Sequence, residues 1–314
     1  MSVYLYSKGI EHAASKMKGN ELIHMGIRPY EMHAGNTLAL VAYPILLCEK
    51  LVAQGKEPAL TFIVSLNDWE QANLIGQDIY KYNFYVMPEN STIQFTVESN
   101  GDYTADLWGR RIVVALEDIK KLYPKVTIKP VYNSDLKEHS SMKQVVLKTI
   151  THRQELKNLM IKSSGRPTIN SELPFASAIC PACHHANTDT NVLDNEILTT
   201  NCQQCGATFT RPYEDFMYWL YHKPLFAARW KVFGFTHSIS GGDHFHEGDV
   251  DTRKALYQFF FNQKAPELEM IFSPILIGDN GQKMSKSRNN FFTIPLETIT
   301  KAARNHDAQH LTVL

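Results

Sequence analysis

The sequence has no excess of either charge and no long hydrophobic run. Lysine plus arginine and aspartate plus glutamate each number 32 among 314 residues, so the formal net charge is zero. The chain therefore lacks the strongly basic field that by itself indicates a nucleic-acid partner, and only a local basic face could hold one. No apolar stretch approaches the roughly 20 residues that a membrane helix needs, so we predict no membrane partner.

Internal repeats, low-complexity segments and a secretion signal are also missing. Residues 4–18 contain three lysines and can form an amphipathic helix, but Glu11 and the lack of arginine argue against a transit peptide. We therefore expect a cytoplasmic location. A chain of this length, with 44% hydrophobic residues, can build one large domain with an insertion, or two domains.

Cysteine is scarce, but four of the five cysteines form a pattern. Cys180 and Cys183 are one C-x2-C pair, and Cys202 and Cys205 are a second pair after 18 intervening residues. This spacing is typical of zinc sites. Four thiolates fill a tetrahedral Zn²⁺ site and leave no position open for catalysis, so we predict a structural zinc.

Other uses of these residues remain open at this point. Two disulfides are the alternative pairing, which the absence of a secretion signal disfavours. His184 and His185 are further candidate ligands, although the second cysteine pair makes them unnecessary. Cys48 lies in an apolar, helix-like segment, and we assign it to the core.

Residues 26–36 (GIRPYEMHAGN) connect a predicted strand to a predicted helix. The apolar run 22–25 precedes them, and the helix-like run 36–42 follows. A strand, a glycine-containing loop and a helix N-terminus together bind phosphate, because unpaired N–H groups and the helix dipole point at the ligand. His33 adds a donor, Gly35 permits close approach of a ligand, and Asn36 is a good N-cap. Alternatively, His33 is only a capped loop residue.

A second loop, Lys283-Met284-Ser285-Lys286-Ser287, lies about 250 residues further along the chain. Glycines at 278 and 281 and asparagines at 289 and 290 flank it, which favours a mobile segment. Two lysines three positions apart can close on a charged transition state and release it afterwards. Taken alone, such a loop is often only solvated surface.

The remaining pattern predicts an α/β fold. Strands are expected at 21–27, 59–66, 92–98, 126–131, 236–240 and 270–277, and helices at 37–53, 111–122, 142–161, 215–232 and 252–261. Pro44 should kink the first of these helices or end it early, and Gly55 should stop it. Strands that alternate with helices form βαβ units and a largely parallel sheet, whose carboxyl edge binds ligands.

We expect three segments in this fold. Residues 1–165 form the first half of a nucleotide-binding α/β domain, 166–213 form a zinc-binding insert, and 214–314 form the second half with the 283–287 loop. The predicted fold is thus a Rossmann-like (HUP-type) parallel sheet with an inserted zinc-ribbon module.

These motifs together resemble those of class I aminoacyl-tRNA synthetases. Residues 33–36 (HAGN) and 283–287 (KMSKS) resemble the two hallmark motifs of that class. Residues 225–230 (LFAARW) and 241–244 (GGDH) resemble the class I type of lysyl-tRNA synthetase. The resemblance covers roughly 20–292, with strong motifs at these four points.

The resemblance implies a ligase that activates an amino acid, most consistently lysine, as an aminoacyl adenylate and transfers it to tRNA. An amino-acid carboxylate is already ionised, so this step needs charge neutralisation and no general base. ATP and Mg²⁺ are the implied cofactors, together with the structural Zn²⁺. The residues implied to act on the phosphates are His33, Asn36, Lys283 and Lys286. The other residues that the resemblance implies in ATP binding are Gly35, Gly241, Gly242, Asp243, His244, Met284 and Ser285.

The sequence also departs from the family pattern. Ala34 replaces a common isoleucine, Gly242 replaces the lysine usual in the lysyl type, and 66–69 lacks the expected acidic residues. The short segment after Ser287 cannot form the helical domain that reads the anticodon in this family, so we expect a catalytic core without it. The acceptor is tRNA, a carrier protein or a small molecule. Two alternatives are a degenerate, non-catalytic paralogue that binds nucleotide, RNA or protein, and a related nucleotidyltransferase.

Specificity for lysine requires a buried acidic group and an aromatic wall around the side chain. The candidates are Glu31, Trp219, Tyr221, Trp230, Glu247 and Asp249. The sequence does not rank them.

Overall fold

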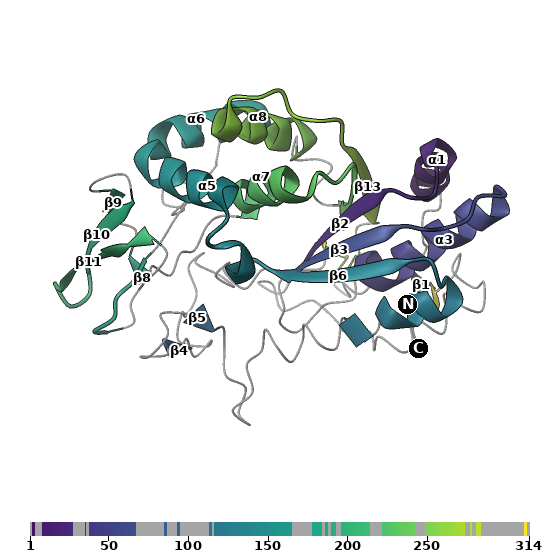
Figure 1. The fold of residues 1–314 in the computed structure, drawn as a ribbon, viewed down its shortest axis with the longest axis horizontal. Helices are drawn as coiled ribbons and strands as arrows, with labels where there is room; N and C mark the ends of the chain where they lie inside the picture. The colour runs from purple at the N-terminus through teal and green to yellow at the C-terminus, as the bar shows by residue number, and fades with distance from the viewer. Residues whose placement is uncertain are drawn as a thin grey trace.

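The computed structural model describes residues 2–3, 8–27, 35, 38–66, 85–86, 93–94, 113–114, 116–164, 178–183, 186–187, 190–192, 196–213, 222–242, 249–273, 277, 281–283 and 311–312. Five parallel strands form the central sheet, in the order β13–β12–β2–β3–β6 (Figure 1). These strands are β2 (Leu22–Ile27), β3 (Thr61–Leu66), β6 (Thr127–Tyr132), β12 (His237–Gly241) and β13 (Glu269–Ser273).

Numbered by their place in the chain, the strands lie in the order 3-2-1-4-5 when read from β6 to β13. This is the strand order of a doubly wound Rossmann sheet, in which ligands bind where the order reverses. Here the reversal falls between β2 and β12. The predicted parallel α/β fold is therefore confirmed.

One face of the sheet is covered mainly by aliphatic side chains. The elements on this face are α1 (Lys8–Lys16), the π-helical segment η1 (Leu38–Ala42), α3 (Tyr43–Ala53) and the helical residues 116–122. Their buried residues join alternate side chains of β2, β3 and β6 in one cluster. Cys48 is fully buried in this cluster, as predicted.

In the described part of the chain, four helices lie on the other side of the sheet (Figure 1). They are α5 (Ser140–Thr151), α6 (Arg153–Ser164), α7 (His222–Phe233) and α8 (Asp249–Phe261). Their buried cluster contains more aromatic side chains than the cluster on the first face. Trp230 is buried at the centre of this layer, and its ring meets those of Phe235 and Tyr257.

Short antiparallel strands form the insert and two further pairs. In the insert, β7 (Ala178–Ile179) pairs with β8 (Ala186–Asn187), and β9 (Thr190–Val192), β10 (Ile197–Asn201) and β11 (Thr208–Pro212) form a three-stranded sheet. Elsewhere β1 (Ser2–Val3) pairs with β14 (Leu311–Thr312), and β4 (Tyr85–Val86) pairs with β5 (Ile93–Gln94).

Three predicted elements differ in the structure. The helix expected over 142–161 is divided into α5 and α6 at His152. The hydroxyls of Thr149 and Thr151 donate to the carbonyls of Val145 and Leu147, and such back-bonding favours a bend. In the described part, the strand expected over 92–98 is only β5, which pairs with β4 outside the central sheet.

The strand expected over 270–277 ends at Ser273, and Ile277 instead makes an isolated antiparallel bridge with Lys283.

Pro44 does not end its helix. It stands in the first turn of α3, directly after the π-helical η1. Proline has no N–H and its ring crowds the preceding turn, which explains the change from π to α geometry there. Gly55 follows this helix at φ +72°, as expected of a stop.

Within the described ranges, no helix has both the length and the hydropathy needed to cross a membrane.

Candidate functional site

The carboxyl ends of the parallel strands form one edge of the central sheet. Gly241, the last residue of β12, lies beside Ser273, the last residue of β13. On the other side of the reversal, Ile27 ends β2 beside Leu66 of β3. Loops that leave these strands share this edge, which is where an open α/β sheet binds its ligand.

Gly35 is the described residue of the first predicted phosphate motif. It is helical and half-buried, and it precedes η1, which contacts both β12 and β13. N–H groups at the start of a helix can bind an anion, but the residues on either side of Gly35 lie outside the described part.

Gly241 and Gly242 follow at the end of β12. Both are half-buried, and Gly241 still pairs with Ser273. A side chain is absent from two consecutive positions at the reversal of strand order, so a ligand can approach the backbone there.

Lys283 is exposed and is positioned by its bridge with Ile277. Four residues span at most about 14 Å, so Ile277 lies within that distance of Ser273 at the sheet edge. Gly281, at φ +71°, makes the turn that brings Lys283 back beside Ile277. The backbone of Lys283 is thus held beside Ile277, four residues after the end of β13.

The other residues predicted for this site lie outside the described residues. They are His33, Asn36, Asp243, His244, Met284, Ser285 and Lys286. The structure thus places Gly241 at the carboxyl edge, gives Gly35 and Gly242 half-buried positions and Lys283 an exposed one, and does not describe their predicted partners.

Of the residues predicted to surround the substrate side chain, one is a core residue and the others have no described side chain. Trp230 is 1% exposed, and its Nε1 donates to the carbonyl of Phe235 at 3.0 Å, so it is a core residue. Asp249 begins α8, but its side chain lies outside the described part. Glu31, Trp219, Tyr221 and Glu247 also lie outside it.

A buried polar layer beneath this edge was missed by sequence reasoning. Arg229 of α7 is fully buried, and its Nη1 donates to Oδ1 of Asn133 at 3.0 Å. Asn133 follows β6, is also fully buried, and donates its N–H to the carbonyl of Leu66 at 3.1 Å. Arg229 therefore joins α7 to the carboxyl ends of β3 and β6. An arginine inside the apolar run 225–230 is the sequence signal that could have indicated it.

His24 of β2 lies in the same layer. Its Nδ1 is 3.1 Å from the hydroxyl of Ser238 on β12, and its ring stacks on Phe235 at 4.6 Å. Burial, with the positive charges of Arg229 and Arg253, lowers the pKa of His24 well below its usual value. His24 is therefore a neutral side chain that joins the two central strands at the reversal.

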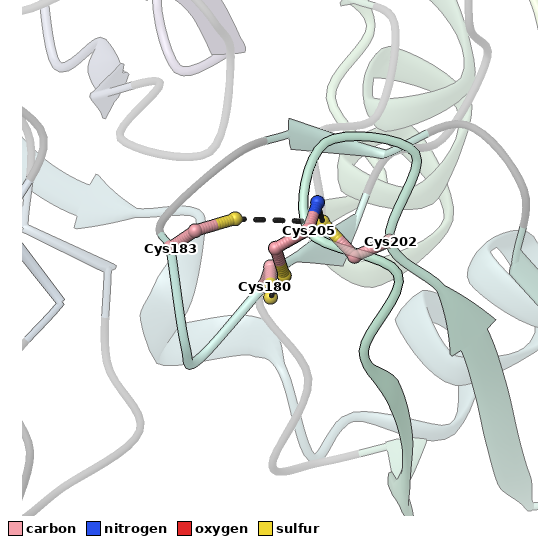
Figure 2. A group of neighbouring side chains, drawn as sticks. All are labelled: Cys180, Cys183, Cys202 and Cys205. Carbon is pink, nitrogen blue, oxygen red and sulfur yellow. Dashed lines mark hydrogen bonds between the residues drawn. The ribbon is translucent and has the colours of Figure 1, made fainter.

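The four cysteines predicted to bind zinc form one cluster (Figure 2). Their sulfurs all lie within 4.8 Å of one another, with Cys180 and Cys205 3.6 Å apart and Cys183 and Cys202 3.4 Å apart. Zn–S bonds of about 2.3 Å in a tetrahedron place the sulfurs about 3.8 Å apart, which these separations fit. None of the four cysteines forms a disulfide in the structure, so the two-disulfide alternative is not what the structure shows.

Each cysteine pair lies on its own tight turn. We call residues 178–187 the first knuckle and residues 201–208 the second knuckle. The N–H of Ala182 donates to the sulfur of Cys180, and the N–H of Cys205 to that of Cys202, both at 3.4 Å. Burial acts to raise the pKa of the Cys202 thiol, but hydrogen bonds from the backbone N–H groups of Cys205 and Gln204 and from neighbouring thiols lower it to about 6. A thiol that ionises this readily is suited to bind a metal.

The insert is fixed to the helices of the main domain. Leu198 of β10 is fully buried in the same cluster as Met142 and Val146 of α5. The Tyr213 hydroxyl donates to the carbonyl of Lys137, and Lys143 of α5 forms an ion pair with Glu196. The cysteine cluster is thus part of a module that packs on α5.

Comparisons with known proteins agree with the motifs. A family model described as tRNA synthetases class I (K) matches residues 10–306. Among solved structures, tyrosyl-tRNA synthetase from Archaeoglobus fulgidus with L-tyrosine is 14% identical, with a TM-score of 0.44 over 94% of this chain and 67% of that one. Tryptophanyl-tRNA synthetase from Campylobacter jejuni is 13% identical, with a TM-score of 0.37 over 93% and 67%. Leishmania major tyrosyl-tRNA synthetase with tyrosinol is 12% identical, with a TM-score of 0.34 over 91% and 39%. No curated protein matches the chain.

Proposed function

This chain belongs to the class I (K) tRNA synthetase family, and on that basis we propose that it activates an amino acid with ATP at the carboxyl edge of its sheet. The observation that carries the proposal is the reversal of strand order between β2 and β12, with Gly241 at the carboxyl end of β12. In the proposed reaction, the amino-acid carboxylate attacks the α-phosphate of ATP, and pyrophosphate leaves as an aminoacyl adenylate forms.

In this proposal, different residues bind the ATP and neutralise the charge of the transition state. The helix start at Gly35 offers N–H groups to the phosphates, as His33 and Asn36 of the same motif would. The Gly241–Gly242 backbone admits the nucleoside. Lys283, with Lys286 of the same loop, neutralises charge that builds up on the α-phosphate and on the leaving pyrophosphate. Mg²⁺, when bound with ATP, would supply further positive charge at the phosphates.

We propose lysine as the amino acid. The support is the resemblance of residues 225–230 and 241–244 to the lysyl type, and the letter K in the family description, which is the one-letter code of lysine. Transfer to tRNA is proposed from the family. A carrier protein or a small molecule would be an acceptor of the same chemistry.

We further propose that the cysteine cluster holds a structural Zn²⁺. Four sulfurs complete its coordination, so the metal would join the two knuckles and take no part in the reaction at the sheet edge. The domain division at residues 165 and 213 is proposed on the same basis, since the module lies between α6 and α7 in the chain.

ATP–pyrophosphate exchange, measured for each of the twenty amino acids with zinc-loaded protein, tests the proposal. We expect exchange with lysine, and no exchange with the others above background. Exchange with a different amino acid would support the proposed reaction and show that lysine is the wrong substrate. No exchange with any amino acid, in protein whose melting temperature ATP leaves unchanged, would reject the enzyme and favour a non-catalytic relative.

A further inference from the structure

Two sulfur–sulfur contacts in the cysteine cluster each join one knuckle to the other. Cys180 of the first knuckle lies 3.6 Å from Cys205 of the second, and Cys183 lies 3.4 Å from Cys202 (Figure 2). Thiols of the same knuckle also interact with each other, so the four sulfurs form one cluster in which the cross-knuckle contacts are already made.

The cluster is also divided between buried and exposed sulfurs. Cys180 and Cys202 are buried, whereas Cys183 and Cys205 are exposed. Each cross-knuckle contact therefore combines one exposed and one buried cysteine. An oxidant in solution reaches the exposed member first, and the buried member is already in contact to react with the product.

We propose that this module is a redox-sensitive metal site. A peroxide converts the four zinc-bound thiolates into two cross-knuckle disulfides, Cys180–Cys205 and Cys183–Cys202, and Zn²⁺ is released. The inference concerns the module alone and does not rest on the reaction proposed for the sheet edge.

The chemistry of each disulfide is a two-electron oxidation of two thiolates by one peroxide. The sulfur of Cys183 attacks one peroxide oxygen, the O–O bond breaks, hydroxide leaves, and a sulfenic acid forms. The sulfur of Cys202 then attacks the sulfur of Cys183 and displaces its oxygen as a second hydroxide while the S–S bond forms. Cys205 and Cys180 react in the same way with a second peroxide. Zn²⁺ loses its thiolate ligands and dissociates.

Cross-knuckle disulfides would preserve the connection that the metal provides. They hold the first knuckle to the second, which continues into β10 and β11 on α5. Disulfides within each C-x2-C pair would instead leave the two knuckles unlinked. We therefore expect the oxidised module to stay folded and the reduced, metal-free module to lose its structure.

The test uses the full-length, zinc-loaded chain treated with hydrogen peroxide. Zinc release is followed with a chromogenic chelator, and the unreduced protein is then cleaved with a protease specific for acidic residues. Asp189, Asp194 and Glu196 lie between the two cysteine pairs, and no lysine or arginine does, so this specificity separates the knuckles where trypsin does not. Cross-knuckle disulfides keep the two cysteine-containing peptides joined, and tandem mass spectrometry of the joined pair assigns the partners.

We expect one zinc released per chain, peptides joined as Cys180–Cys205 and Cys183–Cys202, and full recovery of zinc binding after reduction by a thiol. Disulfides within either pair, sulfinic acids, or zinc retained under peroxide would overturn the proposal, as would a folded chain that binds no zinc. Cys48→Ala is the control. Cys48 is buried, and its pKa is raised by burial to about 12, so this variant should release zinc as the wild type does. Because the peptide mapping is done on the wild-type chain, the result does not depend on a cysteine variant that fails to fold.

Discussion

The candidate site at the sheet edge and the cysteine module differ in how the chain brings their residues together. The four cysteines lie on two local turns between residues 180 and 205, and their spacing in the sequence already fixes the cluster. The proposed site at the edge instead depends on strands from distant parts of the chain, because β2 and β12 become neighbours only through the strand order. A local motif can therefore be read from the sequence, whereas a site built by topology needs the fold.

This difference also separates stability from chemistry. The module packs on α5 through Leu198 and Tyr213, so losing its metal should disturb folded structure. Lys283 is exposed, so removing its ammonium group should disturb the proposed reaction more than the folded structure. The following experiments test how cleanly the two regions divide these roles.

Zinc removal should have the largest effect. With reduced protein, a chelator is expected to unfold the module and lower the melting temperature, because metal binding is coupled to folding in small cysteine-ligated modules. Cys202→Ser should do the same, since it removes a buried ligand. Thermal denaturation with and without chelator measures the effect, and Cys48→Ala is the control that should keep its zinc. An unchanged melting temperature would contradict a structural metal.

Lys283→Ala should lower the rate of ATP–pyrophosphate exchange by about 10²-fold, the usual loss when a group that stabilises transition-state charge is removed. Its melting temperature should stay that of the wild type. Lys162→Ala, which removes an exposed lysine from α6, is the matched control and should leave both quantities unchanged. Equal exchange rates in the two variants would remove Lys283 from the proposed site.

Arg229→Met should cost about 1–3 kcal/mol of stability, because it removes the buried guanidinium that donates to the buried Asn133 side chain. Lys162→Met changes an exposed residue and should cost less than about 0.5 kcal/mol. Denaturant unfolding measures both. A double-mutant cycle with Asn133→Leu isolates the pair, and additive losses would show that the two residues are not coupled.

His24 should make stability depend on pH. Its folded pKa is lowered, chiefly by burial, so stability is complete above the unfolded pKa of about 6.5 and falls as the pH drops below it, by about 1.4 kcal/mol per pH unit. His24→Gln should flatten this slope between pH 7 and 5, and the exposed His12→Gln should leave it. The pKa of His237 is also lowered, chiefly by burial, so part of the slope should remain. An identical slope in His24→Gln would contradict the assignment.

Tyr213→Phe should have the smallest effect, about 1 kcal/mol, because it removes one hydrogen bond between the module and the carbonyl of Lys137. Zinc content should not change. Loss of zinc from the variant would show that metal binding depends on the packing of the module against the helices.

Much of the fold follows from local patterns. The sequence predicted β2, β3, β6 and β12 to within two residues. In β3 the reason is plain, because a strand buried on both faces is nearly continuous in apolar residues. The segment 92–98 also has a strand-like pattern, yet its described part pairs outside the central sheet, since pairing depends on partners distant in the sequence.

The buried layer beneath the edge could not be predicted in the same way. Arg229 and Asn133 are 96 positions apart in the sequence, and the local sequence around either residue does not identify its partner. His24 was read only as part of an apolar run, and its contact with Ser238 depends on the reversal of strand order. Such contacts are set by tertiary structure, as is the division between α5 and α6.

The most direct test of the account is the structure of the zinc-loaded chain with a non-hydrolysable lysyl-adenylate analogue. We predict that the adenylate lies across the carboxyl ends of β2 and β12, with its phosphate near the helix start at Gly35 and its nucleoside against Gly241 and Gly242. An adenylate bound anywhere else on the molecule, or no binding at millimolar concentration, would contradict it.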